Sequence, residues 1–133
     1  MSVKKVGYFV AKLPNHTGAA AHVLNALRGV NLLAFTGFPA GAGSQVDFIP
    51  QSAAAFKAAA KRAKIKVRPK TGCFLIQGGD RPGAIARVMS RLAAAEINVT
   101  AVDAVCAGGG RFGAILWVKP KDAGRAARAL GAR

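Results

Sequence analysis

The stretch that decides the fold reads FLIQGGDRPG at residues 74–83, and EINV follows at residues 96–99. A β-forming run enters a glycine-rich turn, an alanine-rich helical pattern follows, and a second β-forming run begins. An earlier stretch has the same order, reading YFVAKLPNHTG at residues 8–18 and GVNL at residues 29–32. The chain therefore carries one supersecondary pattern twice.

The two copies align with nearly constant spacing. Gly18 aligns with Gly83 and Asn31 with Asn98. The repeat of about 65 residues is longer than a solenoid period and indicates a duplicated small domain. Because a unit of about 65 residues is marginally stable alone, we expect the copies to share a sheet or a core.

The first predicted domain, residues 1–70, has the order βαββαβ. Its first helix has apolar residues at i, i+3, i+4 and i+7 and can be capped by Asn15 or Thr17. Pro50 and Ser52 open its second helix. Its predicted strands are residues 3–12, 31–38, 44–49 and 65–68.

The second predicted domain, residues 71–133, repeats the pattern without a fourth strand. Pro82 lies at the start of its first helix and Asp122 caps its last. Because such a sheet normally places its fourth strand beside its first, the edge of strand 73–77 needs a partner. We expect residues 65–68, or a strand from another chain, to fill that place. The other predicted strands are residues 99–106 and 112–118.

Two β-α-β halves split by a hairpin are typical of the ferredoxin-like arrangement. It is an antiparallel four-stranded sheet covered on one face by two helices. The predicted fold class is therefore α+β, with two ferredoxin-like βαββαβ units in tandem, the second unit lacking its last strand. The free sheet faces favour pairing of the two copies or a homodimer.

Composition excludes several classes of protein. Apolar residues make up 52% of the chain, enough for a buried core, and no apolar run is long enough to span a membrane. The N-terminus has no long apolar segment of the kind found in signal peptides. Cys73 and Cys106 have no metal-like spacing and form no disulfide framework. We expect a reduced, cytoplasmic protein that does not bind membranes.

The net charge of +15 has two interpretations. Seven cations lie within residues 57–70, with no acidic residue among them. They form either a solvated surface or a binding site for nucleic acid or an acidic partner. No aromatic residue lies among them to stack on bases, which favours the solvated surface. These cations, called the basic stripe below, are Lys57, Lys61, Arg62, Lys64, Lys66, Arg68 and Lys70.

No residue pattern points to catalysis. His16 and His22 are too far apart in sequence for a helical metal pair. The few carboxylates are too scattered to suggest an acid/base pair. Residues 37–43, GFPAGAG, lack the Gly-Lys-Ser/Thr ending of a phosphate loop. We expect a protein that is not an enzyme and that uses no metal and no cofactor.

The order of these elements resembles the ACT domain, a family of small ligand-binding regulatory modules of amino-acid metabolism. In the second copy the resemblance rests on Asp80-Arg81-Pro82-Gly83 before a helix and on Glu96-Ile97-Asn98-Val99, where many members have Gly-Val/Ile-Asn-Ile. A glycine-rich hairpin before a last helix is the third feature. In the first copy Gly29-Val30-Asn31-Leu32 matches well, and Asn15-His16-Thr17-Gly18 is a looser version of the turn.

Physical chemistry supports a ligand site at these turns. A strand that enters a helix through Gly83 exposes unpaired amides at the positive end of the helix dipole, where a carboxylate is stabilised. Pro82 has no N–H, so the donors would be those of Gly83, Ala84 and Ile85. The resemblance implies that such sites form between two domains. The predicted ligand-binding residues are Asn15, His16, Gly18 and Asn31 in the first copy and Asp80, Arg81, Gly83, Ala84, Ile85 and Asn98 in the second.

The resemblance implies a non-catalytic regulatory protein. It would bind a free amino acid or a similar small carboxylate at the domain interfaces and act in trans on an enzyme or regulator of amino-acid metabolism. The alternative is an interaction protein that uses the basic stripe to bind nucleic acid or an acidic partner. A purely structural subunit would bind neither ligand nor nucleic acid.

Overall fold

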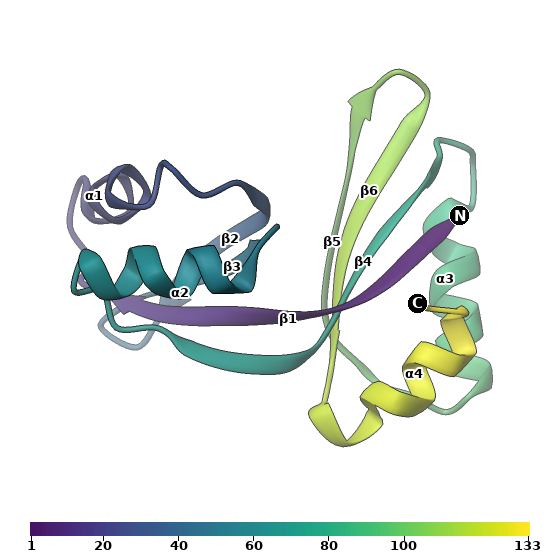
Figure 1. Ribbon diagram of the computed structural model, residues 1–133. Helices are drawn as coiled ribbons and strands as arrows, with labels where there is room; N and C mark the ends of the chain where they lie inside the picture. The colour runs from purple at the N-terminus through teal and green to yellow at the C-terminus, as the bar shows by residue number, and fades with distance from the viewer. The chain divides into compact units, whose positions relative to one another are not determined.

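The computed structural model describes residues 1–133, which form two compact units. One unit, here the first-copy unit, comprises Tyr8–Lys70. The other, the second-copy unit, combines Met1–Gly7 with Thr71–Arg133. Figure 1 labels the helices and strands of both units. The predicted domain ranges 1–70 and 71–133 differ from these units by the first seven residues, and the division into these two domains stays a prediction.

The first-copy unit has the predicted ferredoxin-like strand order, β2-β3-β1-β4. β1 pairs antiparallel with β3, and β3 pairs antiparallel with β2. Three phenylalanines form the centre of its core, with ring centroids 4.8 Å apart for Phe9–Phe56 and 5.1 Å apart for Phe48–Phe56. Its elements are β1 (Ser2–Leu13), α1 (Ala19–Ala26), β2 (Leu32–Ala40), β3 (Gly43–Pro50), α2 (Ala53–Arg62) and the start of β4 (Arg68–Gly79).

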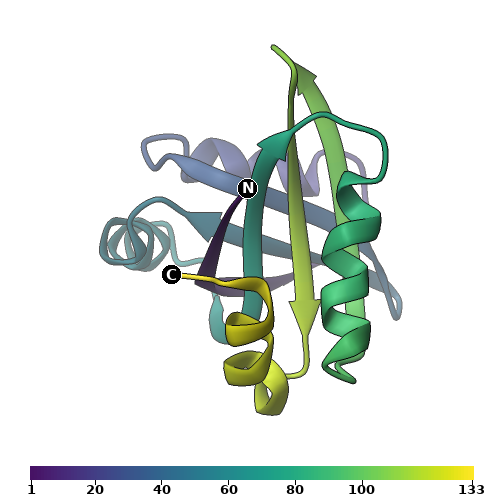
Figure 2. The same ribbon diagram turned by 90° about the vertical axis from the view of Figure 1, so that its right-hand side faces the viewer.

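The second-copy unit has the equivalent order, β1-β4-β6-β5. Its helices lie over one face of its strands (Figure 2). Val88 and Leu92 of one helix and Leu130 of the other are buried against Phe74 and Leu116 of the sheet. Its further elements are α3 (Ala84–Ala94), β5 (Val99–Gly108), β6 (Arg111–Val118), a 3-10 turn (Pro120–Asp122) and α4 (Ala123–Leu130). The predicted α+β, tandem ferredoxin-like fold class is confirmed.

The missing strand of the second-copy unit is supplied by the start of β1. The prediction that residues 65–68 or another chain would supply it is wrong. Val3 is only 4% exposed and belongs to the core of this unit. The backbone N–H of Lys5 donates to Arg133 O at 3.3 Å, and Arg133 N–H donates to Val3 O at 3.1 Å. The twelve-residue β1 is long enough to contribute strands to both units.

The other long strand, β4, is also longer than predicted. It runs without a break from Arg68 to Gly79, so it contains the strand expected at 73–77 but only the last residue of the strand expected at 65–68. Ile65 is not in a strand because its N–H donates to Ala60 O at 2.9 Å, which closes the end of α2. Lys64 adopts a left-handed φ of 57° in this helix-terminating turn.

Helix capping matches the prediction only in part. Ser52 accepts a hydrogen bond from Ala55 N–H at 3.1 Å, which confirms it as the cap of α2. α1 begins at Gly18 without a side-chain cap, so the predicted caps Asn15 and Thr17 are wrong. Asp122 makes no capping bond either, because its carboxylate pairs with Arg125 at 3.0 Å. No helix of the structure is long and apolar enough to cross a membrane.

Candidate functional site

The strand-to-helix turns of the two copies have the same backbone geometry. Gly83 begins α3 with φ 81°, and Gly18 begins α1 with φ 86°. Both values lie in the left-handed region, which glycine adopts without steric cost. In both turns the first helical amide donates to the carbonyl three residues earlier: Ala84 to Arg81 at 3.1 Å and Ala19 to His16 at 3.3 Å. The aligned glycines therefore perform the same structural task.

This geometry removes one of the three predicted ligand donors. The N–H of Ala84 already donates to Arg81 O at 3.1 Å. From the predicted set, the amides of Gly83 and Ile85 are left to meet a carboxylate at the positive end of α3.

A cavity of about 250 Å³ opens beside the second turn, within the second-copy unit. Its wall combines the end of β4, the turn, one side of α3 and the neighbouring strand β6. Arg81 and Ala84 are the two predicted site residues that reach it. The lining residues are Met1, Gly78, Gly79, Arg81, Ala84, Arg87, Arg91 and Phe112.

Two adjacent glycines shape the floor of this cavity. A Cβ atom at Gly78 would lie 2.8 Å from Cε1 of Phe112, closer than real side chains approach. A Cβ atom at Gly79 would lie 3.5 Å from Nε of Arg81. The backbone of β4 therefore approaches the Phe112 ring directly, and the Arg81 side chain lies over Gly79.

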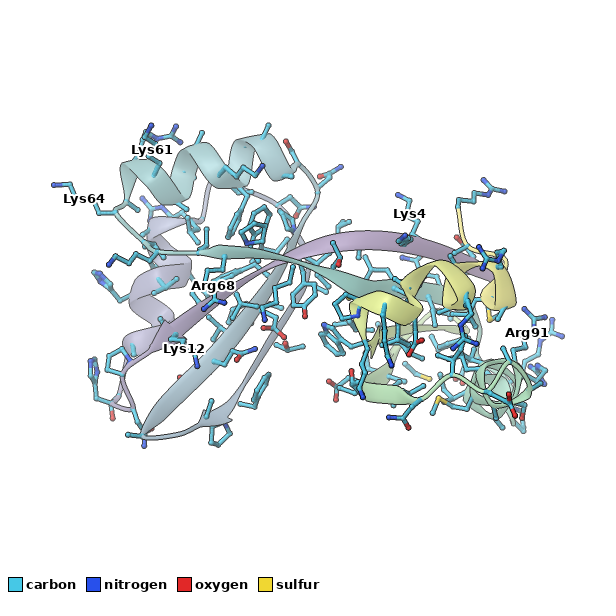
Figure 3. The ribbon with its side chains drawn as sticks, turned by 90° about the horizontal axis from the view of Figure 1, so that it is seen from below. Lys4, Lys12, Lys61, Lys64, Arg68 and Arg91 are labelled. Atoms are coloured by element: carbon cyan, nitrogen blue, oxygen red, sulfur yellow. The ribbon has the colours of Figure 1, made fainter.

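The wall of the cavity is strongly cationic. Arg87 and Arg91 lie four residues apart on exposed positions of α3, so they share one side of the helix. Arg81 precedes them in the turn, and its side chain is also exposed. Figure 3 shows the Arg91 side chain projecting from α3. The one salt bridge of the structure joins Asp122 and Arg125, so these three guanidinium groups have no carboxylate partner in the chain.

Asp80 does not line the cavity. Its backbone N–H donates to Gly110 O at 2.8 Å, which fixes the turn to the β5–β6 hairpin. Its carboxylate accepts a hydrogen bond from the thiol of Cys106 on β5. That hydrogen bond is the main cause of a raised pKa of the Cys106 thiol, with smaller contributions from desolvation and from the Asp80 charge. Asp80 is thus engaged with β5.

The two predicted asparagines lie far from the turn of their own unit. Asn98 precedes β5, beyond the opposite end of α3 from Gly83, and eleven helical residues span about 16 Å. Asn31 is likewise beyond the far end of α1, where its Nδ2 donates to Oε1 of Gln51 at 3.0 Å. Within one unit, neither asparagine can contact a ligand held at the helix start.

The first turn is more open than the second. Asn15 and His16 are exposed, and Nδ1 of His16 lies 3.2 Å from Thr17 O. A Cβ atom at Gly18 would meet no atom within 4 Å. The predicted residues of the first copy therefore cluster in sequence, and none of them lines the cavity beside the second turn.

Arg87, Arg91 and Phe112 were absent from the predicted site. Their signal in the sequence is the four-residue spacing of the two arginines directly after the Asp-Arg-Pro-Gly turn, which places both on the side of the helix that Arg81 approaches. The contribution of Phe112 could not be read from the sequence because it depends on the antiparallel register that sets Phe112 opposite Gly78.

The basic stripe is exposed along its whole length. All seven of its cations are exposed, on α2, on the turn after α2 and on the start of β4. Figure 3 shows Lys61 and Lys64 at the end of α2 and Arg68 on β4, with Lys12 of β1 in the same unit.

Comparisons with known proteins identify the fold. No family model matches the chain, and no curated protein does. Among solved structures, a Bacteroides thetaiotaomicron protein matches with a TM-score of 0.81 at 17% identity, covering 97% of this chain and 88% of that one. The regulatory subunit of aspartate kinase from Thermus thermophilus, in its ligand-free form, matches with a TM-score of 0.65 at 18% identity, covering 98% and 93%. The corresponding subunit from Thermus flavus gives 0.59 at 16%, covering 98% and 94%.

These matches span nearly the whole of both chains, so the likeness covers both units. At this level of identity they establish the fold. The resemblance to the ACT domain is confirmed at that level, and the fold is one that known regulatory subunits use.

Proposed function

We propose that this ACT-like protein is a non-catalytic regulator that binds a free amino acid or a similar small carboxylate and acts in trans on an enzyme or regulator of amino-acid metabolism. The observation that carries the proposal is the cavity of about 250 Å³ beside the start of α3. Fold neighbours described as regulatory subunits of aspartate kinase support a regulatory role.

The local chemistry of the second turn supports carboxylate binding. The start of α3 offers the amides of Gly83 and Ile85 and the positive end of the helix dipole. Arg81 adds a guanidinium group that can hold a carboxylate through two parallel hydrogen bonds. The cavity beside this turn is lined by Arg81 and two further arginines, so we place the primary ligand at the second copy.

Regulation requires that the ligand distinguish two states of the protein. The effect on an equilibrium, such as assembly into a homodimer or binding to a partner enzyme, cannot exceed the difference in ligand affinity between those states. The turn between β4 and α3 is suited to this because it joins the two elements that form the cavity wall.

Isothermal titration calorimetry against the twenty amino acids and a set of small carboxylic acids tests the proposal. We expect at least one of them to bind and to change the sedimentation behaviour of the protein. Substitution Gly83→Ala is expected to weaken that binding, with Gly18→Ala as the matched control in the other copy. No heat from any carboxylate at millimolar concentration would refute the proposal.

A second candidate function is favoured by the basic stripe. Its seven exposed cations can attract phosphates along one unit. Binding of generic RNA or DNA would weaken steeply with salt and would be lost when Lys61, Arg62 and Lys64 are replaced by Glu. Nucleic-acid binding that is unchanged by these three substitutions would exclude this second candidate function.

A further inference from the structure

We infer that the cavity beside α3 selects a compact anion with two negative charges, a phosphate group or a dicarboxylate, over a neutral zwitterion. The inference rests on the proposed function and narrows its ligand. The guanidinium groups of Arg81, Arg87 and Arg91, which line this cavity, would hold that anion.

The charge of the cavity wall points to a dianion. Three of its eight lining residues are arginines, and none is acidic. A single carboxylate can pair with one guanidinium group and leaves the other two repelling each other. Arg87 and Arg91 are four residues apart on α3, a spacing at which like charges destabilise a helix. An anion with two charges relieves that repulsion in the bound state.

The ammonium group of a zwitterion finds no partner in this cavity. The nearest acidic residue in the sequence, Asp80, is absent from the lining, and its carboxylate accepts the Cys106 hydrogen bond on the β5 side of the turn. An ammonium group held among three arginines would be desolvated beside like charges. The cavity therefore discriminates against ligands whose net charge is zero.

The size of the cavity limits the ligand. About 250 Å³ is below the range of roughly 300–1,000 Å³ typical of sites for drug-sized molecules. A phosphate ion or a four-carbon dicarboxylate is small enough for this volume, and three of the residues that line it carry a guanidinium group. The Phe112 ring and the Met1 side chain supply apolar contact for a short carbon chain.

Calorimetry with inorganic phosphate and with succinate, at constant ionic strength set by NaCl, tests the inference. Binding of at least one of the two dianions is expected. Tighter binding of phosphate would indicate a phosphoryl ligand, and tighter binding of succinate would indicate a dicarboxylate ligand. The substitutions Arg87→Gln and Arg91→Gln should each weaken binding by about tenfold or more, since each removes a charge-assisted hydrogen bond. Arg87→Lys keeps the charge but loses the planar fork, so its affinity should be intermediate.

Arg128→Gln is the matched control. Arg128 is an exposed arginine on α4 of the same unit and does not line the cavity. The Arg128→Gln substitution removes one positive charge from the protein, as Arg87→Gln and Arg91→Gln do. A general effect of the net charge of +15 would therefore appear equally in this variant. Melting curves of all variants, followed by circular dichroism, verify that they fold.

The outcomes separate the inference from the proposed function. If a neutral amino acid binds and neither dianion does, the inference is wrong and the proposed function stands. If phosphate binds through the arginines and no carboxylate binds, the inference stands and the proposed function is wrong. Dianion binding that Arg87→Gln, Arg91→Gln and Arg128→Gln weaken equally would reveal nonspecific attraction and overturn the inference.

Discussion

At the scale of single residues, two aligned glycines allow the same strand-to-helix turn to form in both copies. Gly18 and Gly83 have φ values of 86° and 81°, and each is followed directly by a helix. A side chain in this conformation brings Cβ close to the following carbonyl oxygen. The backbone therefore favours glycine at both positions.

We expect Gly18→Ala and Gly83→Ala each to lower the free energy of unfolding by about 1–2 kcal/mol, because both force a Cβ atom into the left-handed region. Urea denaturation measures the change. Gly29→Ala is the control, since Gly29 has no positive φ and no atom lies within 4 Å of its added Cβ. Equal stability losses at Gly29 and Gly83 would contradict the explanation.

The contact between Asp80 and Cys106 predicts that the Cys106 thiol is alkylated slowly. Because the carboxylate raises the pKa of the Cys106 thiol, less thiolate is present at a given pH, and alkylation near pH 8 should be slower than for an ordinary exposed cysteine. Asp80→Asn removes the charge and should raise the alkylation rate there. The alkylation rates of the wild-type and Asp80→Asn proteins should converge at high pH, where the Cys106 thiol is ionised in both.

The alkylation rate can be measured with iodoacetamide and mass spectrometry. Cys73 serves as an internal reference, since it is buried at 0% exposure and should stay unmodified in the folded protein. An unchanged Cys106 rate in the Asp80→Asn protein would show that the carboxylate does not control the thiol.

At the scale of elements, the end of β4 and the start of α3 form the cavity together. The glycine pair 78–79 leaves the strand without side chains where the Phe112 ring and the Arg81 side chain lie. Arg87 and Arg91 then line it from α3. The strand, the turn and the helix therefore each contribute one part of the site.

We expect Gly78→Ala to destabilise the protein by about 1–3 kcal/mol, because the added methyl overlaps the Phe112 ring at 2.8 Å and forces it to move. Gly79→Ala meets Arg81 at an ordinary contact distance of 3.5 Å and should be tolerated. Thermal melting of the two variants compares neighbouring positions in one strand. A Gly79→Ala protein that is less stable than the Gly78→Ala protein would show that the register with β6 does not set the effect.

At the scale of the whole molecule, the C-terminal end of the chain lies beside its first strand. The first residues of β1 complete the second-copy unit, and the backbone of Arg133 bonds to Val3 and Lys5. The second-copy unit therefore depends on residues at both ends of the sequence. The same strand continues into the first-copy unit, where Phe9 is a core residue.

We expect Val3→Asp to destabilise the second-copy unit selectively, because it places an unpaired charge in the core beside Phe74 and Ile76. Hydrogen exchange should show lost protection in β5 and β6 and retained protection in β2 and β3. Lys4→Asp, at the exposed neighbouring position, should change neither. Equal loss in both units would show that the first-copy and second-copy units do not unfold independently.

The sequence by itself determined the duplication, the βαββαβ order and the two glycine turns. These follow from local rules: the apolar period distinguishes helix from strand, and glycine is favoured where the backbone is left-handed. The turn that holds Arg81, Gly83 and Ala84 could therefore be predicted from the sequence, and the role of these residues in ligand binding stays a prediction. The capping roles expected for Asn15 and Thr17 were wrong because α1 begins at Gly18, which has no side chain, and that of Asp122 was wrong because its carboxylate pairs with Arg125.

The strand that completes the second-copy unit and the side chains that surround the cavity were not predictable from the sequence. Both depend on contacts between residues far apart in the chain, such as Val3 with Arg133 and Gly78 with Phe112. Pairing rules specify that an edge needs a partner but do not say which strand provides it. Strand register and chain topology determine which strand is the partner. They also place three arginines around the cavity beside the turn that the sequence predicted to bind a carboxylate.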